Sequence, residues 1–188
     1  MSKAEPTEAV DPNAPVTGMD YFMQLDYHEL VCPSVRRYRS ALIDGKLIGH
    51  RCPKCKLVYV PPRGYCPIDT IETTDADEVQ LVDRGVIANY TVVTPVQYYG
   101  QEETEPFVRV SVILDEPGGT MSLQDVVDIP VDDVHIGQRV EAVWLPPEER
   151  DISEIGNRSW GSADGAITGW KLTGEPDVPP DQVPGSAF

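Results

Sequence analysis

The feature that most constrains this chain is the stretch HRCPKCKLVYVPPRGYCPID, residues 50–69. Cys52 and Cys55 form a Cys-x2-Cys knuckle, which places two thiolates around one tight turn and leaves backbone amides free to bond to sulfur. Cys66 and Asp69 repeat this spacing, with an oxygen donor in the fourth position. Tetrahedral zinc accepts a carboxylate oxygen in place of sulfur. The pattern therefore predicts a zinc hairpin whose ligands are Cys52, Cys55, Cys66 and Asp69.

Three alternatives compete with this ligand set. His50 is only two residues from Cys52, although it precedes the knuckle and is expected to point away from the metal. Cys32 is expected to be a small buried residue, because free cysteine is among the most buried residue types. The third alternative is a metal-free hairpin whose thiols only pack together. With four ligands the zinc is structural, because a catalytic zinc keeps one position open for water.

The charge of the chain is unevenly distributed. Its formal net charge is −16, yet residues 36–63 hold eight basic side chains against one acid, Asp44. A small polyanion such as coenzyme A is one ligand for such a local field, and a solvated helix face is the simpler interpretation. The candidate phosphate contacts are Arg36, Arg37, Arg39 and Arg63.

The pattern of apolar residues predicts a mainly β protein. Val35, Tyr38 and Leu42 at helical spacing, followed by Gly45, predict a helix over 34–44. Strand-like stretches flank the first knuckle, and four or five more strand signals follow between about 79 and 146, with Gly85 as an expected bulge. This favours a helix and zinc ribbon at 34–75 and a five-stranded OB-fold barrel, closed or nearly closed, at 76–148.

Extended terminal arms flank the two modules. Residues 1–33 are expected to be an N-terminal arm, partly disordered, and residues 149–188 a C-terminal extension and tail. Aromatic rings in segments that have little periodicity must lie on the barrel or on a partner. The candidate partner contacts are Tyr21, Phe22, Tyr27, Trp160 and Trp170.

Composition and motifs exclude several classes of function. Nucleic acid is an improbable partner for a chain of charge −16 whose barrel region, residues 79–145, holds only three basic residues, because such binding neutralises phosphates with Lys and Arg. No apolar run approaches the roughly 20 residues that span a bilayer, and the N-terminus lacks an apolar signal stretch. We therefore expect a cytoplasmic protein with no membrane partner. No pair of histidine and nucleophile is recognisable, so no catalytic residue is assigned.

Several segments together resemble one protein family. They are the basic helix, GHRCPKCKLVYVPPRGYCPID, the strand GVIANYTVV and the closing strand IGQRVEAVWL, which cover about residues 34–145. They are similar to acyl-CoA-associated proteins made of an N-terminal rubredoxin-like zinc ribbon and a C-terminal OB-fold. LTGEPD, residues 172–177, resembles the ending of a subgroup found with lipid-transfer-type, thiolase-like enzymes of actinobacterial steroid degradation. In that subgroup the fourth knuckle position often departs from cysteine.

The resemblance implies a non-catalytic accessory subunit. Relatives bind thiolases or thiolase-like aldolases of the sterol-carrier-protein type, often as heterotetramers of two plus two chains. The partner supplies the catalytic residues, and in the steroid case a β-hydroxyacyl-CoA side chain is cleaved by retro-aldol reaction. The coenzyme A thioester is then the substrate of the complex, and the zinc of this chain is structural. The alternative is a partner or coenzyme A-binding subunit of an acyl-CoA thiolase or acyltransferase complex.

Overall fold

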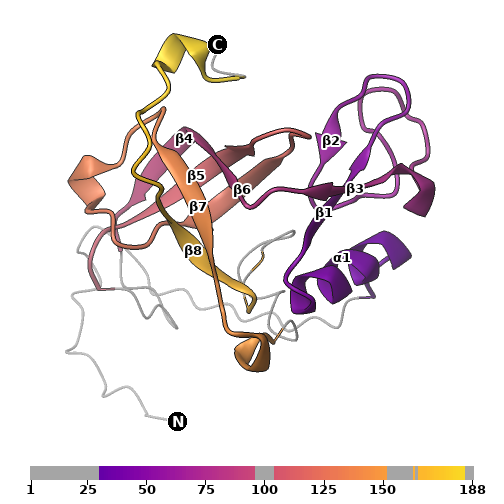
Figure 1. Cartoon of the computed structure of the whole chain (residues 1–188), viewed down its shortest axis with the longest axis horizontal. Coiled ribbons are helices and arrows are strands. Elements are labelled where there is room, and N and C mark those ends of the chain that lie inside the picture. The colour runs from indigo at the N-terminus through magenta and orange to yellow at the C-terminus, as the bar shows by residue number, and fades with distance from the viewer. Residues whose placement is uncertain (1–29, 96–103, 152–162, 164, 185–188) are drawn as a thin grey trace, which may run out of the picture.

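The computed structural model of the chain describes residues 30–95, 104–151, 163 and 165–184. Within these residues it has one α-helix and eight strands in two sheets, which lie beside each other in Figure 1. The elements are α1 (Pro33–Ile43), β1 (Leu47–Arg51), β2 (Val58–Tyr59), β3 (Glu78–Leu81), β4 (Arg84–Val93), β5 (Phe107–Leu114), β6 (Thr120–Asp125), β7 (Arg139–Trp144) and β8 (Ile167–Leu172). No helix in this part of the chain is long and apolar enough to cross a bilayer.

Helix α1 forms where the apolar spacing predicts it. Pro33 stands at its first position, where the missing N–H needs no partner. Tyr38, Ala41 and Leu42 are buried and form the face that packs on the small sheet. Gly45, with a φ of 72°, ends the helix in the left-handed conformation that glycine adopts without steric penalty. The predicted helix at 34–44 is thus confirmed, one residue earlier at each end.

The small sheet has the strand order β2-β1-β3, with β1 in the centre. Residues 47–50 of β1 are all buried, because α1 and two strands surround them. β3 pairs with β1 from Leu47↔Leu81 to His50↔Glu78. β3 follows the predicted domain boundary at residue 75, and its hydrogen-bonding partner is the central strand of the small sheet.

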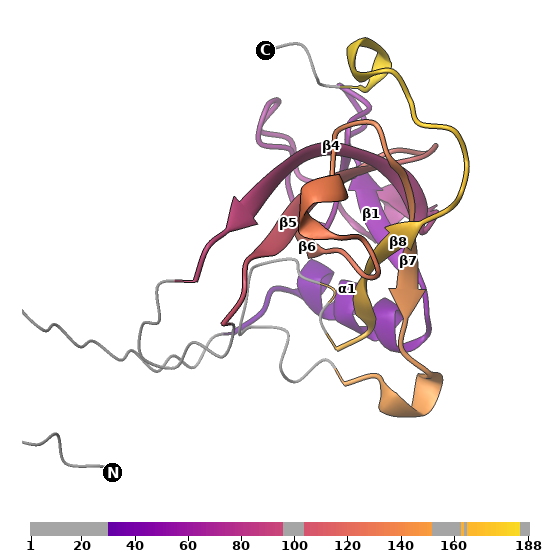
Figure 2. The same cartoon turned by 90° about the vertical axis from the view of Figure 1, so that its left-hand side faces the viewer.

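The large sheet has the strand order β6-β5-β4-β7-β8. Its inner face shows clearly in β5, where every second residue from Val108 to Leu114 is buried. β4 arches across this sheet in Figure 2. A register shift between Ile87 and Asn89 interrupts the pairing of β4 with β5. The bulge expected at Gly85 therefore lies a few residues further on.

The five strands of the large sheet do not close through a full ladder in the described part of the chain. The edge strand β8 and the chain just after β6 meet at an isolated parallel bridge between Val126 and Trp170, where the Val127 amide donates to the Trp170 carbonyl (2.8 Å). The predicted barrel is therefore nearly closed. Its fifth strand is β8, which lies after residue 148. The strand signal at residues 78–81, which was counted toward the barrel, forms β3 of the small sheet instead.

Trp170 is the largest fully buried side chain of the described residues. Its ring lies in the hydrophobic core, and its Nε1 donates to Oε1 of buried Gln124 at 3.3 Å. A ring in this position cannot contact a partner, so Trp170 is removed from the candidate partner contacts. The other four candidates, Tyr21, Phe22, Tyr27 and Trp160, lie outside the described residues.

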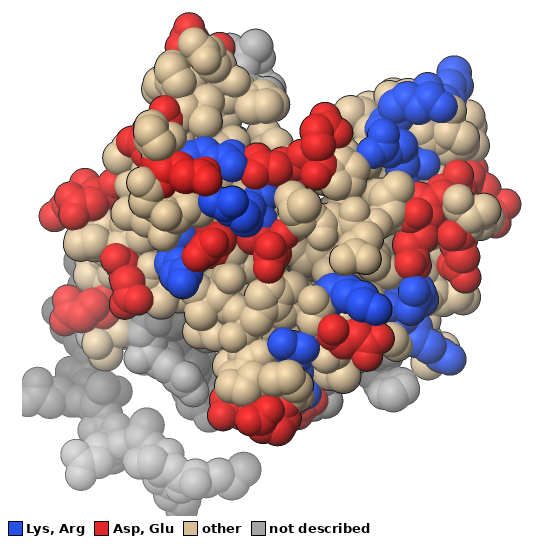
Figure 3. Space-filling model, in the orientation of Figure 1, with Lys and Arg blue, Asp and Glu red and all other residues tan. Residues whose placement is uncertain are grey.

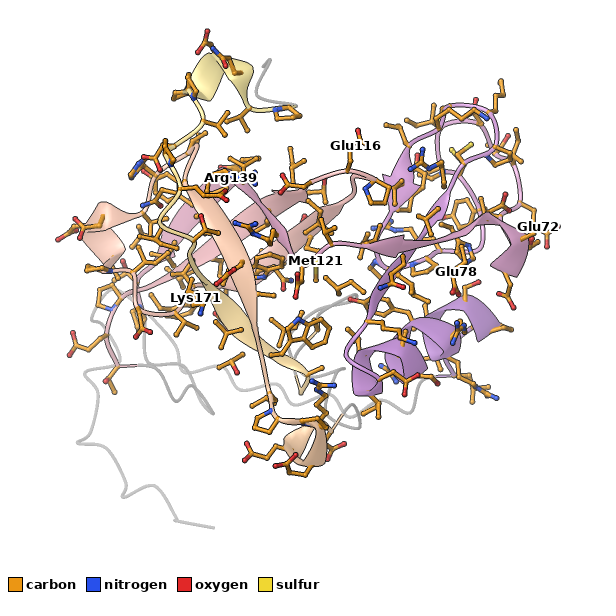
Figure 4. The ribbon with its side chains drawn as sticks, viewed as in Figure 1. Glu72, Glu78, Glu116, Met121, Arg139 and Lys171 are labelled. Carbon is orange, nitrogen blue, oxygen red and sulfur yellow. The ribbon has the colours of Figure 1, made fainter. Side chains whose placement is uncertain are left out.

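Contacts at both ends of β1 join the ribbon to the large sheet, among them a hydrogen bond from Arg51 to the Pro117 carbonyl (3.4 Å). The turn between β5 and β6, marked by Glu116 in Figure 4, approaches the ribbon so closely that a Cβ on Gly119 would lie 2.8 Å from Val60 Cγ2. At the other end of β1, Arg150 donates to the Leu145 and Ile43 carbonyls, at 2.9 and 3.0 Å. The guanidinium thus binds the C-terminal end of α1, where a cation is favoured.

Two glycines of the large sheet differ in what surrounds them. A Cβ on Gly85 would lie 2.2 Å from the backbone oxygen of Ile113. A Cβ on Gly169 would first meet a side-chain methyl group, Cγ2 of Val127, at 2.7 Å. We expect Gly85→Ala to destabilise the protein by about 1–3 kcal/mol, as overpacking does, and Gly169→Ala to destabilise it less. Thermal unfolding of the two variants measures this order, and the reverse order would contradict the described approach of β4 and β5.

Candidate metal centre

The first knuckle is a tight turn that begins at Cys52. The Cys52 amide donates to the Leu57 carbonyl (2.9 Å), and the Cys52 carbonyl accepts from the Lys56 amide (3.1 Å). Lys56 adopts a φ of 65°, which turns the chain back toward its start at a cost of about 1 kcal/mol or more. The Lys54 amide points at the sulfur of Cys52, 3.4 Å away. The turn therefore holds the Cys52 sulfur in place, with a backbone N–H directed at it.

The second knuckle repeats these contacts around Cys66. The Cys66 amide donates to the Ile71 carbonyl, its carbonyl accepts from the Thr70 amide (both 2.8 Å), and Thr70 has a φ of 55°. The Asp69 amide lies 3.4 Å from the Cys66 sulfur. Because the two turns are built alike, Asp69 occupies the place that Cys55 holds in the first. The half-motif in the sequence is thus a complete knuckle in the structure.

The four predicted ligands come together in one cluster. One donor atom from each of Cys52, Cys55, Cys66 and Asp69 lies within 4.8 Å of the others. The Cys55 and Cys66 sulfurs are 3.7 Å apart, and Asp69 Oδ2 is 3.4 Å from the Cys52 sulfur and 3.7 Å from that of Cys66. A zinc tetrahedron with bonds of about 2.3 Å to sulfur and about 2.1 Å to oxygen has edges of about 3.6–3.8 Å. The residues present therefore fit a tetrahedral ion.

The surroundings of the cluster lower the pKa values of two of its ligands, Asp69 and Cys66. The ammonium of Lys54, 2.8 Å from Asp69 Oδ1, and then the thiol of Cys55 lower the pKa of Asp69 to about 2. Burial alone would raise the pKa of Cys66. A hydrogen bond from Tyr59 and the backbone amides of Asp69 and Ile68 outweigh burial and lower it to about 7. Asp69 is therefore an anion at neutral pH, and Cys66 loses its proton near neutral pH.

The pKa of Cys55 is shifted in the opposite direction. The Leu57 amide favours its thiolate, but burial and the neighbouring groups Asp69, Cys52 and Cys66 raise the pKa of Cys55 to about 11. Too many negative charges meet in one place for all of them to be ionised unless a cation balances them. A divalent ion supplies that balance, so the cluster is chemically incomplete as a set of free side chains.

Two side chains outside the ligand set support the cluster. The Tyr59 hydroxyl lies 3.3 Å from the Cys66 sulfur and the Lys54 ammonium bonds Asp69. Such outer contacts orient metal ligands and tune their charge. Sequence reasoning missed both residues. Lys54 had a signal, because it lies between two metal-binding cysteines, whereas the approach of Tyr59 depends on the hairpin geometry.

The alternative ligands lie elsewhere. His50 is buried and its Nδ1 is 3.1 Å from Thr73 Oγ1, outside the cluster, while burial lowers its pKa. Cys32, expected to be buried, is exposed, because it is the N-cap residue before α1 and lies outside the buried face of the helix. Neither residue contributes to the metal-binding group of the described residues.

The four candidate phosphate contacts are not brought together around one ligand. Arg37 makes two 3.0 Å hydrogen bonds to Glu78 of β3, which raise its pKa. Arg63 alone of the four lines a pocket of about 480 Å³ beside the start of α1, together with Cys32, Ser34 and Thr73. A coenzyme A site made from all four arginines therefore has no support in this geometry.

Removal of single ligands tests the cluster. We expect Asp69→Ala to keep zinc through three sulfurs but to weaken its binding by at least about tenfold, since even outer-sphere changes have effects of this size. Cys52→Ser should unfold the ribbon, because metal binding and folding are coupled in such small domains. Competition with a chromophoric chelator measures the zinc affinity of both variants, and circular dichroism measures the unfolding. Asp75→Ala, a change at a neighbouring acid, is the control. Unchanged affinity in Asp69→Ala would exclude it as a ligand.

The pKa values predict how zinc binding depends on pH. Zinc must displace the Cys55 proton throughout the neutral range, because the pKa of that thiol is about 11. Below the Cys66 pKa of about 7 one further proton must leave, so affinity should fall more steeply with decreasing pH there, by about tenfold more per pH unit. Chelator competition at several pH values measures the slope. An equal slope on both sides of pH 7 would contradict the Cys66 assignment.

Comparisons with known proteins agree with this architecture. Residues 39–67 match the rubredoxin-like zinc ribbon domain of ChsH2, and residues 78–145 match the C-terminal OB-fold domain of ChsH2. The chain is 36% identical over 141 residues to a DUF35 domain-containing scaffold protein of Methanocaldococcus jannaschii, covering 73% of this chain and 88% of that protein.

Two solved structures are similar to the chain. The Ltp2-ChsH2(DUF35) aldolase matches with a TM-score of 0.52 and 20% identity, over 77% of this chain and 98% of that chain, and shares the fold. A DUF35 protein of unknown function from Sulfolobus solfataricus matches with a TM-score of 0.44 and 20% identity, over 59% and 78% of the two chains. The sequence identity to the scaffold protein and the two matched domains show that this chain belongs to the DUF35 family, in which a rubredoxin-like zinc ribbon precedes an OB-fold.

Proposed function

We propose that the chain is the non-catalytic accessory subunit of a thiolase-like, sterol-carrier-protein-type aldolase that cleaves the β-hydroxyacyl-CoA side chain of a steroid by retro-aldol reaction. The supporting observation is its likeness to a scaffold protein over nearly the whole length of that protein. The fold is also that of a chain in the Ltp2-ChsH2(DUF35) aldolase. The zinc of this subunit, held by Cys52, Cys55, Cys66 and Asp69, would be structural.

The described residues bring no histidine and nucleophile together where a substrate can reach them. His50 and Thr73 come nearest to a base and a nucleophile, but they are only 1% and 4% exposed. The exposed His135 bonds Asp177 and the Asp133 carbonyl, so acceptors face both ring nitrogens, and these contacts raise its pKa. Two acceptors favour the protonated form of this ring, which cannot act as a base. Catalysis then belongs to the partner.

The arginines of the large sheet are paired with acids, which argues against a nucleic-acid partner. Arg109 pairs with Asp125 at 2.7 Å and Arg139 with Asp115 at 2.6 Å. Arg84 pairs with Glu175 at 2.6 Å. A groove for a nucleic acid needs cations that are free to meet phosphates. The three arginines of this sheet are instead committed to neighbouring carboxylates.

A second candidate function, coenzyme A binding by this chain, is favoured by one pocket. Arg63 and Ser34 line it beside the start of α1, where no acid occupies the first turn of the helix. Helix N-termini and arginine favour phosphate. Glu72 and Asp75 also line the pocket and oppose an anion, so the accessory-subunit proposal stands first.

Purification from the native host tests the first candidate. We expect the tagged chain to recover a thiolase-like enzyme in equal amount, as a complex of two plus two chains by light scattering, with one zinc per copy of this chain. The complex should cleave a steroid β-hydroxyacyl-CoA, and neither component alone should do so. Recovery of the chain without such an enzyme, or full activity of the enzyme alone, would refute the proposal.

Titration of the isolated chain with coenzyme A separates the two candidates. The accessory-subunit proposal predicts no binding by the chain on its own. Binding that is lost in Arg63→Ala but kept in Arg36→Ala, a matched change at an exposed arginine outside the pocket, would instead support the second candidate.

A further inference from the structure

We propose that the outer end of the zinc ribbon docks on an acidic surface of the catalytic subunit that has an apolar pocket. This inference rests on the proposed function for the identity of the partner. The surface, called the ribbon tip, consists of Lys54, Lys56, Leu57, Arg63, Tyr65 and Ile68. All six belong to the two knuckles or to the link between them.

The ribbon tip exposes apolar side chains at a place where the local fold is rigid. Leu57, Tyr65 and Ile68 are 49%, 52% and 67% exposed, although exposed apolar groups usually lie singly. The knuckles carry these side chains on backbone that is bonded around Cys52 and Cys66. A surface that is already ordered loses little conformational entropy when it binds, so its apolar area contributes fully to affinity.

The charge of the ribbon tip identifies what covers it. The ribbon tip holds three cations, Lys54, Lys56 and Arg63. Lys54 pairs with Asp69 of the metal cluster, whereas Lys56 and Arg63 are exposed. Zinc with three thiolates and one carboxylate carries a charge of about −2, which the three cations exceed by about one. Figure 3 shows cations gathered over the ribbon loops at the upper right. A buried charge must be paired, so a surface that covers Lys56 and Arg63 has to supply carboxylates.

The negative charge of the rest of the chain determines which end of the molecule faces an acidic partner. Because the overall charge is −16 while the ribbon is basic, an acidic partner attracts the ribbon tip and repels the remaining surface. A second copy of this chain could also offer acids to the ribbon tip. Such a contact would be head to tail and would not close into a dimer, so the catalytic subunit is the better occupant.

Binding kinetics with the catalytic subunit recovered in the purification test this inference. Leu57→Ser and Ile68→Ser should raise the dissociation rate by about tenfold or more, and Lys56→Glu should lower the association rate and its sensitivity to salt. Leu172→Ser, at a leucine 45% exposed on β8, and Lys46→Glu, at an exposed lysine outside the ribbon tip, are matched controls and should bind like the wild type. Zinc content and melting temperature should stay unchanged in all five variants.

The outcomes separate this inference from the proposed function. If the wild-type chain binds the enzyme and the variants of the ribbon tip bind equally well, the docking surface is elsewhere and only this inference fails. If the wild-type chain recovers no thiolase-like enzyme, the proposed function fails and this inference fails with it. Concentration-dependent self-association that is lost in the ribbon-tip variants would assign the surface to a second copy and overturn the proposed partner.

Discussion

The convergence of three thiols and one carboxylate is the interaction on which the ribbon depends. β2 has only two residues, and a strand this short cannot hold a hairpin by its ladder alone. What fixes the hairpin is the pair of matching turns around Cys52 and Cys66, each with a left-handed residue that the chain adopts against its steric preference. A bound ion repays this strain, since four bonds to one centre replace the repulsion among the ligands.

The ribbon is in turn built into the larger sheet. Gly119 lets the turn after β5 approach Val60, and Arg150 connects the chain after β7 to the end of α1. The same Arg150 lies over the ring of Trp144, at 5.3 Å from its centroid, and Trp144 donates to Asp83 just before β4. Packing and polar contacts thus hold the two modules at both ends of their junction. This arrangement suits a protein that presents one surface in a constant position relative to the other.

Sequence reasoning found what depends on local pattern and missed what depends on distant pairing. The helix, the two knuckles and the alternating strand β5 each carry a period or spacing that is visible in the chain. The assignment of β3 to the ribbon depends on Leu81 lying opposite Leu47, and no local signal contains that pairing. β8 was missed because Thr168, Gly169 and Lys171 dilute its apolar pattern, so that only Trp170 marked it. Tyr59 was missed for the same reason, because its contact with Cys66 exists only after the hairpin closes.

The distribution of charge pairing connects the metal centre to the proposed role. In the large sheet the cations are used internally: Arg139 bonds both Asp115 and Glu175, and Glu175 also bonds Arg84, which lowers the pKa of Glu175. These pairs fasten the segment after β8 across the sheet and leave little charge to recognise a ligand. At the ribbon tip, by contrast, Asp69 is withdrawn into the metal cluster, and Lys56 and Arg63 are exposed. Cations that are not paired with a neighbouring carboxylate can still pair with one on a partner. This is why the ribbon tip rather than the OB-fold is the place to expect the partner.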